Sequence, residues 1–387
     1  MKIGFVSRWG VRCGISTYSD QLVGALSRHG ADVFCVAETV GSLVEVPLES
    51  KINFIRCWRG QDMSVDDTFV HLKIGRAMVA HFQHEFGILN QPRPLLKLLT
   101  VLKNSGVPSV FTCHTVMPKP HTQTAWFFAD LMRQTDAVVV HTEGAKNAIV
   151  DWGHNPGMVH VIPHGTKENC QAIDKKSARE ALGLPADPGL VVAVSLGFIT
   201  PGKMQRETIH EIMNLVRDGI LDPKKFLFLV AGEPGQNDRA NIRYCNEIQR
   251  LVEESQASDY IRIVPRFIPV EELPTWYGAA DFAITASHQT FFSTSGRSHQ
   301  EMAFGVPSIS SRERLLSDLD DSRSVKFDLG GDGEGGFRAA LMRIMEDQAL
   351  RAELSVNCLK FAAETSWTNV ARQHIELYSS LINGHRQ

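Results

Sequence analysis

The sequence predicts two doubly wound α/β domains that face each other across a cleft. Three observations support this fold class. The 387 residues are enough for two domains that each bury a core of their own. Short apolar runs recur along the chain and are nearly continuous in Val, Ile and Phe, as in parallel strands that are buried on both faces. Helical segments separate most of these runs, and such alternation favours parallel sheets with right-handed crossovers.

The composition describes a folded chain, with 43% hydrophobic and 21% charged residues. A net charge of −3 gives no electrostatic basis for binding nucleic acid, so no nucleic-acid partner is expected. The seven cysteines are odd in number and form no CxxC pair, which favours a reduced, cytoplasmic protein without disulfides. We also expect neither a signal peptide nor a membrane-spanning helix, because the chain opens on a strand-like run and has no stretch of about 18 apolar residues.

The N-terminal half contains seven expected strands. Ligands of doubly wound sheets bind beyond the carboxyl ends of the strands, so the segments that follow each strand are candidates for the site. Helices are expected between the strands, for example over 15–28 and 94–103. The expected strands are Lys2–Ser7, Asp32–Ala37, Ile52–Cys57, Ala77–Gln83, Ser109–Cys113, Ala137–His141 and Met158–Ile162.

The segment 94–103 is amphipathic, with a wide apolar face and flanking basic residues. A helix that covers the sheet explains this pattern most simply. The alternative is a patch that contacts the inner face of a membrane peripherally, as a lipid-linked acceptor would require.

Four histidines follow successive expected strands. They are His84 (next to Glu85), His114, His141 and His164. Together they indicate a polar pocket at one edge of the sheet. A zinc site is not expected, because Ile88 stands where the second histidine of an HExxH motif would be. A glycine loop also follows the first strand, and Gly14 at its end opens a helix, where backbone N–H groups can approach a ligand closely.

The C-terminal half repeats the same alternation after a polar, turn-rich stretch over 166–188. We expect an N-terminal domain over 1–168, a linker over 169–188, a second domain over 189–365 and a final helical segment over 366–387. The strands expected in the second domain are Leu190–Leu196, Phe226–Ala231, Ile261–Val264, Asp281–Ala286 and Pro307–Ser310.

Two segments of the second domain suit a nucleotide diphosphate. The glycine-rich turn 197–203 ends in Lys203, which can place a point charge on a phosphate. Further along, Ser293, Thr294, Ser295 and Gly296 form a hydroxyl-rich loop before a helix that starts at about Arg297. A helix N-terminus of this kind offers N–H groups and the positive end of its dipole to an anion. Glu301, early in that helix, can accept hydrogen bonds from the two hydroxyls of a ribose.

The segment QEMAFGVPSIS, residues 300–310, resembles the E-A-M-A-x-G-x-P-V-V segment of retaining glycosyltransferases of the GT-B fold, family 4. Glu301 matches the second Glu of that family's motif, whereas the first Glu, which contacts the donor sugar, is replaced by Ser293. Relatives of this type carry a Thr-Ser-Gly loop instead. The turn 197–203 resembles the family's G-x-x-x-x-K-G loop, but Phe198 takes the place of its arginine. Arg206 or Arg297 would then supply the second cation.

The resemblance implies a role for each matching residue. Gly14 would face the donor diphosphate, and His114 would lie beside the donor sugar. His84 and Glu85 would line the acceptor side, with Glu85 orienting the acceptor hydroxyl. Arg266 and Phe267 lie in the loop whose backbone contacts the nucleotide base. The last helix, with Thr368 as its N-cap, would cross back to the first domain.

The expected activity is therefore retaining transfer of a sugar from a nucleotide-diphosphate sugar to an acceptor hydroxyl on a polysaccharide, glycolipid or small glycoside. No metal or other cofactor is expected. Since Ser293 removes the obvious carboxylate nucleophile, a front-face mechanism with the leaving phosphate as base is the working hypothesis. Two other classes stay open: a nucleotide-sugar epimerase of the same fold, and a partner subunit that binds nucleotide sugars but has lost catalysis.

Overall fold

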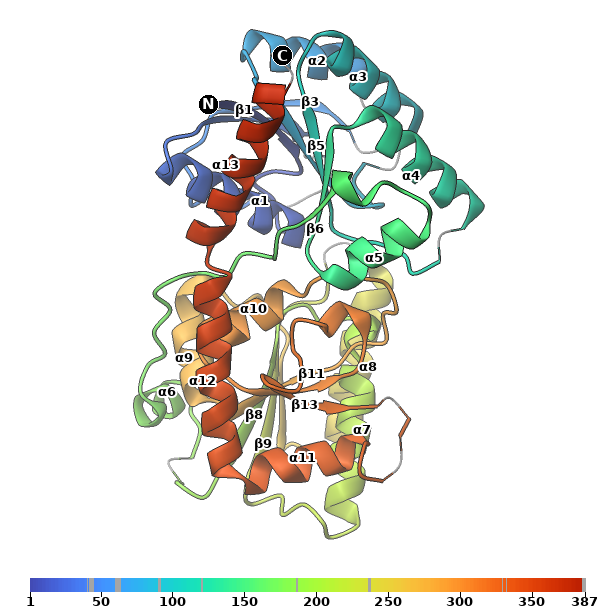
Figure 1. Cartoon of the computed structure of the whole chain (residues 1–387). Coiled ribbons are helices and arrows are strands. Elements are labelled where there is room, and N and C mark those ends of the chain that lie inside the picture. The colour runs from blue at the N-terminus through green and yellow to red at the C-terminus, as the bar shows by residue number, and fades with distance from the viewer. Residues whose placement is uncertain are drawn as a thin grey trace. The chain divides into compact units, whose positions relative to one another are not determined.

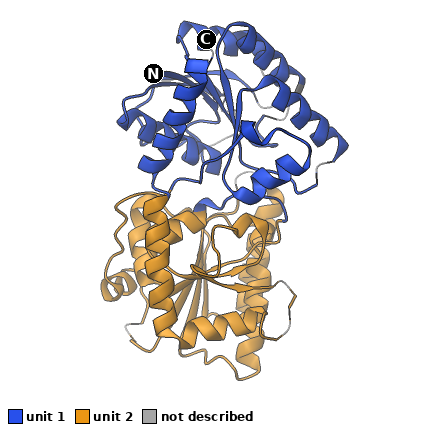
Figure 2. Cartoon of the chain, in the orientation of Figure 1, with its two compact units in different colours: residues 1–165, 290–296, 365–387 blue, residues 166–289, 297–364 orange. Residues whose placement is uncertain are grey.

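The structure, a computed structural model, describes residues 1–39, 41, 45–59, 64–89, 92–119, 121–185, 187–235, 238–328, 330–331 and 333–384. It divides into two compact units, coloured separately in Figure 2. The N-terminal unit comprises Met1–Gly165, Thr290–Gly296 and Thr365–Gln387. The C-terminal unit comprises Thr166–Gln289 and Arg297–Glu364. Each unit contains one parallel sheet with helices packed on it, which confirms the predicted fold class of two Rossmann-like α/β domains.

The sheet of the N-terminal unit has the strand order β3-β2-β1-β4-β5-β6-β7, and its strand pairs are all parallel. Figure 1 labels most of these elements. The strands are β1 (Lys2–Ser7), β2 (Asp32–Glu38), β3 (Phe54–Trp58), β4 (Val79–His84), β5 (Ser109–Cys113), β6 (Ala137–Val140) and β7 (Val159–Val161). The helices are α1 (Gly14–Arg28), α2 (Val65–Ile74), α3 (Pro92–Asn104), α4 (Thr122–Gln134), α5 (Glu143–Asp151) and α13 (Trp367–Gly384).

Alternate residues of the central strands enter two separate cores, because successive side chains of a strand point to opposite faces. Ile3 and Phe5 of β1 pack with α1 and α13 on one face of the sheet. Val6 of β1 and Phe82 of β4 pack with α3, α4 and α5 on the other. The carboxyl ends of β4, β5, β6 and β7 are thereby held by apolar layers on both faces.

The sheet of the C-terminal unit has the order β10-β9-β8-β11-β12-β13. Its strands are β8 (Val191–Leu196), β9 (Phe226–Ala231), β10 (Ile261–Val264), β11 (Phe282–Thr285), β12 (Ser308–Ser311) and β13 (Ser324–Phe327). The helices are α6 (Lys175–Ala181), α7 (Gln205–Arg217), α8 (Arg239–Glu254), α9 (Leu273–Ala279), α11 (Phe337–Glu346) and α12 (Gln348–Glu364). Helix α10 (Gly296–Ala303) starts at the last residue of the N-terminal unit's short segment and continues in the C-terminal unit.

All the strands predicted from the sequence are present within two residues of their predicted bounds, but β13 was missed. This edge strand is only SVKF and has no long apolar run. One further expectation was wrong. Thr368 is not the N-cap of α13, because the helix already begins at Trp367. The stretch 169–188, expected as a linker, contains α6, whose Arg179 is buried and ion-paired with Asp281 at 2.8 Å.

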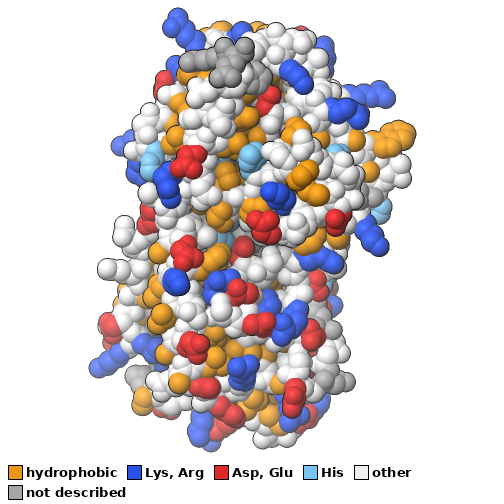
Figure 3. All heavy atoms as spheres, viewed as in Figure 1, with side chains coloured by type: hydrophobic (Ala, Val, Ile, Leu, Met, Phe, Trp, Pro, Cys, Tyr) orange, Lys and Arg blue, Asp and Glu red, His pale blue; other side chains and the backbone are white. Residues whose placement is uncertain are grey.

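The amphipathic segment 94–103 lies in α3, whose apolar face belongs to the core. Leu95, Leu98, Leu99 and Leu102 are all buried there. This packing favours a helix that covers the sheet over one whose leucines contact a membrane. No helix in the described part of the chain combines the length and apolarity needed to cross a bilayer. On the face shown in Figure 3, positive and negative side chains are interspersed over both units.

Candidate functional site

The first group of candidate residues lies at the carboxyl end of β8 in the C-terminal unit. Gly197 follows the strand with a φ of 101°, a conformation that favours glycine. A short 3-10 turn, Pro201–Lys203, then brings the lysine back over this glycine. A Cβ atom placed on Gly197 would lie 3.2 Å from Lys203 Nζ. The glycine therefore permits both the bend of the chain and the close approach of the ammonium group.

Arg297 reaches the same strand end from α10, and Glu301 of that helix reaches the end of the neighbouring strand β11. Arg297 Nη1 donates to Ser195 Oγ at 3.0 Å, and its Nε lies 3.4 Å from Glu301 Oε1. Both oxygens of Glu301 accept from Thr285 Oγ1, at 3.0 and 2.9 Å. Glu301 is 1% exposed, so its carboxylate is held by these partners below the surface.

Lys203, Arg297 and Glu301 together form what we call the cluster. Burial shifts the pKa values of Lys203 and Glu301. The pKa of the half-buried Lys203 is lowered to about 7, mainly by removal from water and also by the positive charge of Arg297, while Glu301 opposes the shift. Burial raises the pKa of Glu301, whereas Arg297, Thr285 and Lys203 act to lower it. With both cations protonated and Glu301 ionised, the cluster has one net positive charge in a partly desolvated place. Such a site suits an anion.

Of the two arginines considered as the second cation, only Arg297 lies in this cluster. Arg206 is exposed and pairs with Glu207 at 3.0 Å. Sequence reasoning missed Ser195 and Thr285, which hold Arg297 and Glu301. A signal existed, because each is a hydroxyl residue at or near the end of an otherwise apolar strand.

The predicted base-side residues lie in the loop after β10. Arg266 donates to both oxygens of Glu272, at 2.9 and 2.6 Å, and Phe267 is exposed. The guanidinium of Arg266 therefore binds a carboxylate that lies six residues further along the chain, and the aromatic ring of Phe267 faces solvent.

The hydroxyl-rich loop 293–296 belongs to the N-terminal unit, where its neighbour Phe292 forms an antiparallel bridge with Val116. The two N–H···O bonds of this bridge are each 2.8 Å long. Ser293 and Ser295 are half-buried in this loop. Thr294 Oγ1 is buried and has no hydrogen-bond partner among the described residues. Gly296 opens α10, and a Cβ atom there would lie 3.6 Å from His164 Nε2.

Three of the four strand-end histidines meet around Tyr18 of α1. The Tyr18 ring lies 4.7 Å from the ring of His114, 5.3 Å from that of His141 and 5.1 Å from that of His164. These three of the four predicted histidines therefore lie together at the carboxyl ends of β5, β6 and β7. Both ring nitrogens of His114 are engaged inside the unit, with Gln83 Oε1 at 2.7 Å and His141 Nε2 at 3.3 Å.

His84 lies in an aromatic surrounding instead. Its ring is buried and stacks on Phe127 at 5.3 Å, with further edge contacts to Phe86 and Phe128. Burial lowers the pKa of His84 to about 4, and neither ring nitrogen has a hydrogen-bond partner among the described residues. The neighbouring Glu85 accepts from Thr115 Oγ1 at 2.6 Å, and burial raises the pKa of its carboxyl group.

Gly14 is the first residue of α1 and is exposed. A Cβ atom there would meet no protein atom within 4 Å among the described residues. A small side chain at Gly14 would therefore be accommodated by these residues without a clash. The preceding Cys13 makes no side-chain cap, so it does not cover the first N–H groups of the helix.

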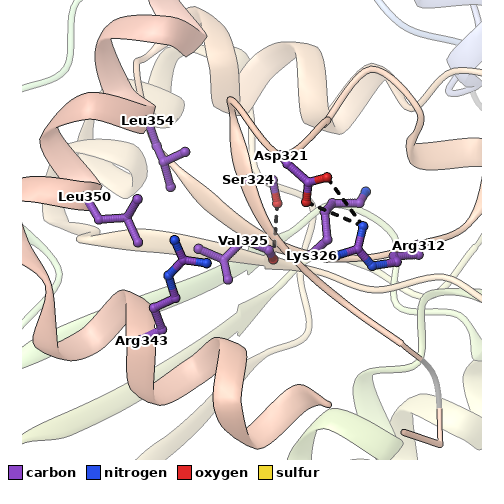
Figure 4. Close-up of a pocket in the computed structure, with 8 residues that line it drawn as sticks. All are labelled: Arg312, Asp321, Ser324, Val325, Lys326, Arg343, Leu350 and Leu354. Carbon is purple, nitrogen blue, oxygen red and sulfur yellow. Dashed lines mark hydrogen bonds and ion pairs between the residues drawn. The ribbon is translucent and has the colours of Figure 1, made fainter. Parts of the chain in front are cut away.

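Other places in the fold offer less to the predicted chemistry. The described side chains include no group of three or more His, Cys, Asp or Glu that could hold a metal ion. A cavity of about 300 Å³ in the C-terminal unit lies among β13, α11 and α12 (Figure 4). Its walls contain Lys326, Arg343 and the Arg312–Asp321 ion pair, and none of the predicted site residues.

Two solved structures have the same fold over the whole chain. HepE of Anabaena, crystallised with UDP, gives a TM-score of 0.75 at 14% identity, covering 98% of this chain and 100% of HepE. Sucrose-phosphate synthase of Thermosynechococcus elongatus also gives a TM-score of 0.75, at 16% identity and 99% and 100% coverage. With its two parallel-sheet units, the chain thus has the GT-B fold of glycosyltransferases.

Sequence comparisons match the chain to one family model and to several named glycosyltransferases. Residues 13–168 match the family model described as Glycosyltransferase Family 4. D-inositol 3-phosphate glycosyltransferase 2 of Catenulispora acidiphila is 26% identical over 252 residues, or 64% of this chain and 56% of the relative. D-inositol 3-phosphate glycosyltransferase of Streptosporangium roseum is 27% identical over 292 residues, or 72% and 65%. The matches span less than two thirds of the length of these curated relatives.

Proposed function

We propose that the protein is a retaining glycosyltransferase that moves a sugar from a nucleotide-diphosphate sugar to an acceptor hydroxyl. The observation on which this rests is the cluster of Lys203, Arg297 and Glu301 at the carboxyl end of β8. Preorganised cations in a desolvated place stabilise the charge that develops on a departing diphosphate more strongly than the same groups do in water. The names of the family and of the relatives agree with this activity.

In this proposal Lys203 and Arg297 bind the diphosphate, and Glu301 accepts hydrogen bonds from the ribose. The N–H groups at the start of α1, at Gly14, add to the binding of the anion. His114 orients the donor sugar, and Glu85 orients the acceptor hydroxyl. Since the two cations can neutralise the leaving group, the proposal requires no metal ion.

Retention is proposed to follow a front-face route. Ser293 occupies the position of the family's first Glu, so this position supplies no carboxylate that could form a glycosyl-enzyme. The departing diphosphate would instead accept the proton of the attacking hydroxyl. Trapping of a covalent glycosyl-enzyme would exclude this route.

The acceptor class remains broad in the proposal, and so does the place of action. A polysaccharide, a glycolipid or a small glycoside would each present the required hydroxyl, and the curated relatives are named for D-inositol 3-phosphate. We propose a cytoplasmic enzyme. Peripheral contact with the inner face of a membrane would be expected only if the acceptor is a lipid.

The first experiment is a thermal-shift panel with UDP, GDP, ADP, dTDP and CDP on the wild type and on Lys203→Ala and Glu301→Ala. Lys224→Ala serves as the matched control, because Lys224 is an exposed lysine in a turn. We expect one nucleotide to raise the Tm of the wild type and of the control, and both site variants to lose the shift. If no nucleotide shifts the wild type, the proposed donor site is wrong.

A second experiment separates the three candidate activities. The stabilising nucleotide is supplied as its sugar derivative, with and without acceptors that include D-inositol 3-phosphate. Product that forms only with an acceptor indicates a transferase, and interconversion of the donor without an acceptor indicates an epimerase. Binding without turnover under both conditions indicates a catalytically inactive partner subunit.

A further inference from the structure

A line of hydrogen-bonded side chains runs through the N-terminal unit and ends at His114. Tyr378 Oη lies 2.6 Å from His81 Nδ1, and His81 Nε2 lies 3.1 Å from Gln83 Nε2. Gln83 Oε1 lies 2.7 Å from His114 Nε2. His114 Nδ1 lies 3.3 Å from His141 Nε2, and His141 Nδ1 lies 3.0 Å from the carbonyl oxygen of Ile162. The line thus joins α13, β4 and the ends of β5, β6 and β7.

Every side chain of this line is buried, with at most 6% of its surface exposed. His81 and Gln83 are two residues apart on β4, so they point to the same face of the sheet. An apolar side chain at these positions would avoid the free-energy cost of burying polar groups. Folding alone therefore does not account for the polar residues of this line.

The protons of the line can be assigned from its fixed end. His141 Nδ1 faces a carbonyl oxygen, which only accepts, so this nitrogen bears the proton. In a neutral His141 the Nε2 atom then accepts, and the proton between the two rings belongs to His114 Nδ1. Burial holds the pKa of His114 well below its usual range, with the nearby histidines adding to the effect, so this ring is neutral and its Nε2 accepts.

The protonation state of His114 also determines the orientation of the Gln83 amide. An unprotonated His114 Nε2 needs a donor, so the Gln83 amide is turned by about 180° about its last torsion, which places its NH2 group beside His114 and its oxygen beside His81. His81 Nε2 then donates, within reach of both Gln83 and Thr112 Oγ1, which is 2.7 Å away. His81 Nδ1 accepts from the Tyr378 hydroxyl. Every member is satisfied when all the hydrogen bonds run in the direction from Tyr378 to Ile162.

We propose that Tyr378, His81 and Gln83 are positioning residues that fix the tautomer and the ring orientation of His114. This inference rests on the proposed function for its catalytic consequence. Both ring nitrogens of His114 are engaged within the protein. The donor sugar would therefore contact the surface of an immobile imidazole ring and make no hydrogen bond with its nitrogens. Tyr18, whose ring stands edge-on to His114 at 4.7 Å, limits its movement from another side.

The test that needs no activity is the ¹⁵N NMR spectrum of the histidine rings. We expect His114 in the wild type to be neutral, with its proton on Nδ1 and with Nε2 unprotonated. In Gln83→Glu the carboxylate can only accept, so the His114 signal should change to a form protonated on Nε2. A wild-type His114 that already bears the proton on Nε2, or a signal that Gln83→Glu leaves unchanged, would overturn the inference.

The catalytic consequence is tested with Tyr378→Phe, which removes one hydroxyl group. We expect kcat for sugar transfer to fall roughly threefold to tenfold, as for the loss of one hydrogen bond, while KM for the donor stays within about twofold. Tyr277→Phe is the matched control, because Tyr277 is also buried and its hydroxyl has no partner among the described residues. Equal losses in both variants, or a loss of Tyr378→Phe activity that follows only its lower Tm, would contradict a positioning role. If the wild type transfers no sugar, the proposed function fails, and the NMR result still decides the hydrogen-bond direction.

Discussion

The guanidinium of Arg297 and the carboxylate of Glu301 lie 3.4 Å apart, and their side chains are 8% and 1% exposed. The two residues stand four positions apart on α10, so they project from the same face of the helix. Removing one member of a buried ion pair leaves an uncompensated charge and typically costs about 3–5 kcal/mol of stability. The functions of these residues are therefore best separated by substitutions that keep shape and by ligands that differ in one part.

Glu301→Gln should show whether Glu301 binds the ribose or the diphosphate of the donor nucleotide. The amide keeps the volume of the carboxylate but has one acceptor oxygen instead of two, and it raises the net positive charge of the cluster. We expect the ratio of UDP affinity to pyrophosphate affinity to fall about tenfold, because a hydrogen bond to a charged group contributes roughly 1.5–3 kcal/mol. Titration calorimetry with both ligands measures this ratio, and Glu247→Gln, an exposed carboxylate, is the control. An equal loss for both ligands would show that Glu301 acts only through the fold.

Arg297→Met should weaken binding of the donor nucleotide by about 10-fold to 100-fold, since it removes a cation from the cluster. Arg206→Met should change it by less than about twofold, because that arginine faces solvent and pairs with Glu207. The Kd of the stabilising nucleotide is measured for both variants at 0.15 M salt, after their Tm values show that they are folded. A larger loss of nucleotide affinity in Arg206→Met than in Arg297→Met would indicate that Arg206 is the second cation.

Donor binding should depend on pH through Lys203. Its pKa of about 7, lowered mainly by burial, means that the ammonium is charged below pH 7 and largely neutral above it. A diphosphate favours the charged form, so affinity should fall above pH 7 by up to about tenfold per unit until the pKa of the complex is reached. Measurements over pH 7 to 9.5 avoid the second ionisation of the phosphate near pH 6. Lys203→Arg should give a flat profile, and a wild-type profile equally flat would contradict the assignment.

The lowered pKa of Lys203 should also make the stability of the fold depend on pH. Stability should rise with pH, whereas donor affinity should fall. The unfolded lysine retains its proton up to about pH 10.4, so between pH 7 and 10.4 the unfolded state binds more protons than the folded state. The contribution of Lys203 to the free energy of unfolding therefore rises with pH in this window. Denaturant titrations at pH 7 and 9 measure the free energy of unfolding of the wild type and of Lys203→Met. The advantage of Lys203→Met over the wild type should be smaller at pH 9 than at pH 7.

Two glycines should respond to alanine in contrasting ways. A Cβ atom on Gly232 would lie 1.9 Å from the carbonyl oxygen of Gly197, and its φ is +154°. We expect Gly232→Ala to lower stability by roughly 1–3 kcal/mol and to disturb the loop before Lys203. The methyl group of Gly14→Ala would meet none of the described residues within 4 Å, so its Tm should stay near that of the wild type while donor affinity falls, because the added methyl group enters the space of the ligand. Calorimetric Tm and nucleotide Kd are measured for both. A Gly14→Ala variant with unchanged Kd would remove that helix end from the proposed site.

Much of the fold could be predicted from the sequence because strands buried on both faces must be apolar throughout. Runs such as Phe226–Ala231 have this property and were recognised, whereas the short edge strand β13, Ser324–Phe327, is paired on one side only and shows no such run. Lys203 and Glu301 were found by their loop and motif. The choice of Arg297 over Arg206 could not be made, because spacing along the chain does not say which arginine turns inward.

The amino-acid sequence on its own determined the order of strands and helices, the alternation that makes both sheets parallel, and the strand-end positions where polar residues gather. These properties are local, since they depend on periodicity, glycine and burial of each segment. Only the tertiary structure decided which polar residues meet. It gathered His114, His141 and His164 around Tyr18, placed His84 among aromatic rings, and brought Tyr378 of the last helix to His81, 297 positions earlier in the chain. The hydrogen bonds of a buried side chain depend on neighbours that are remote in sequence, so no local pattern encodes them.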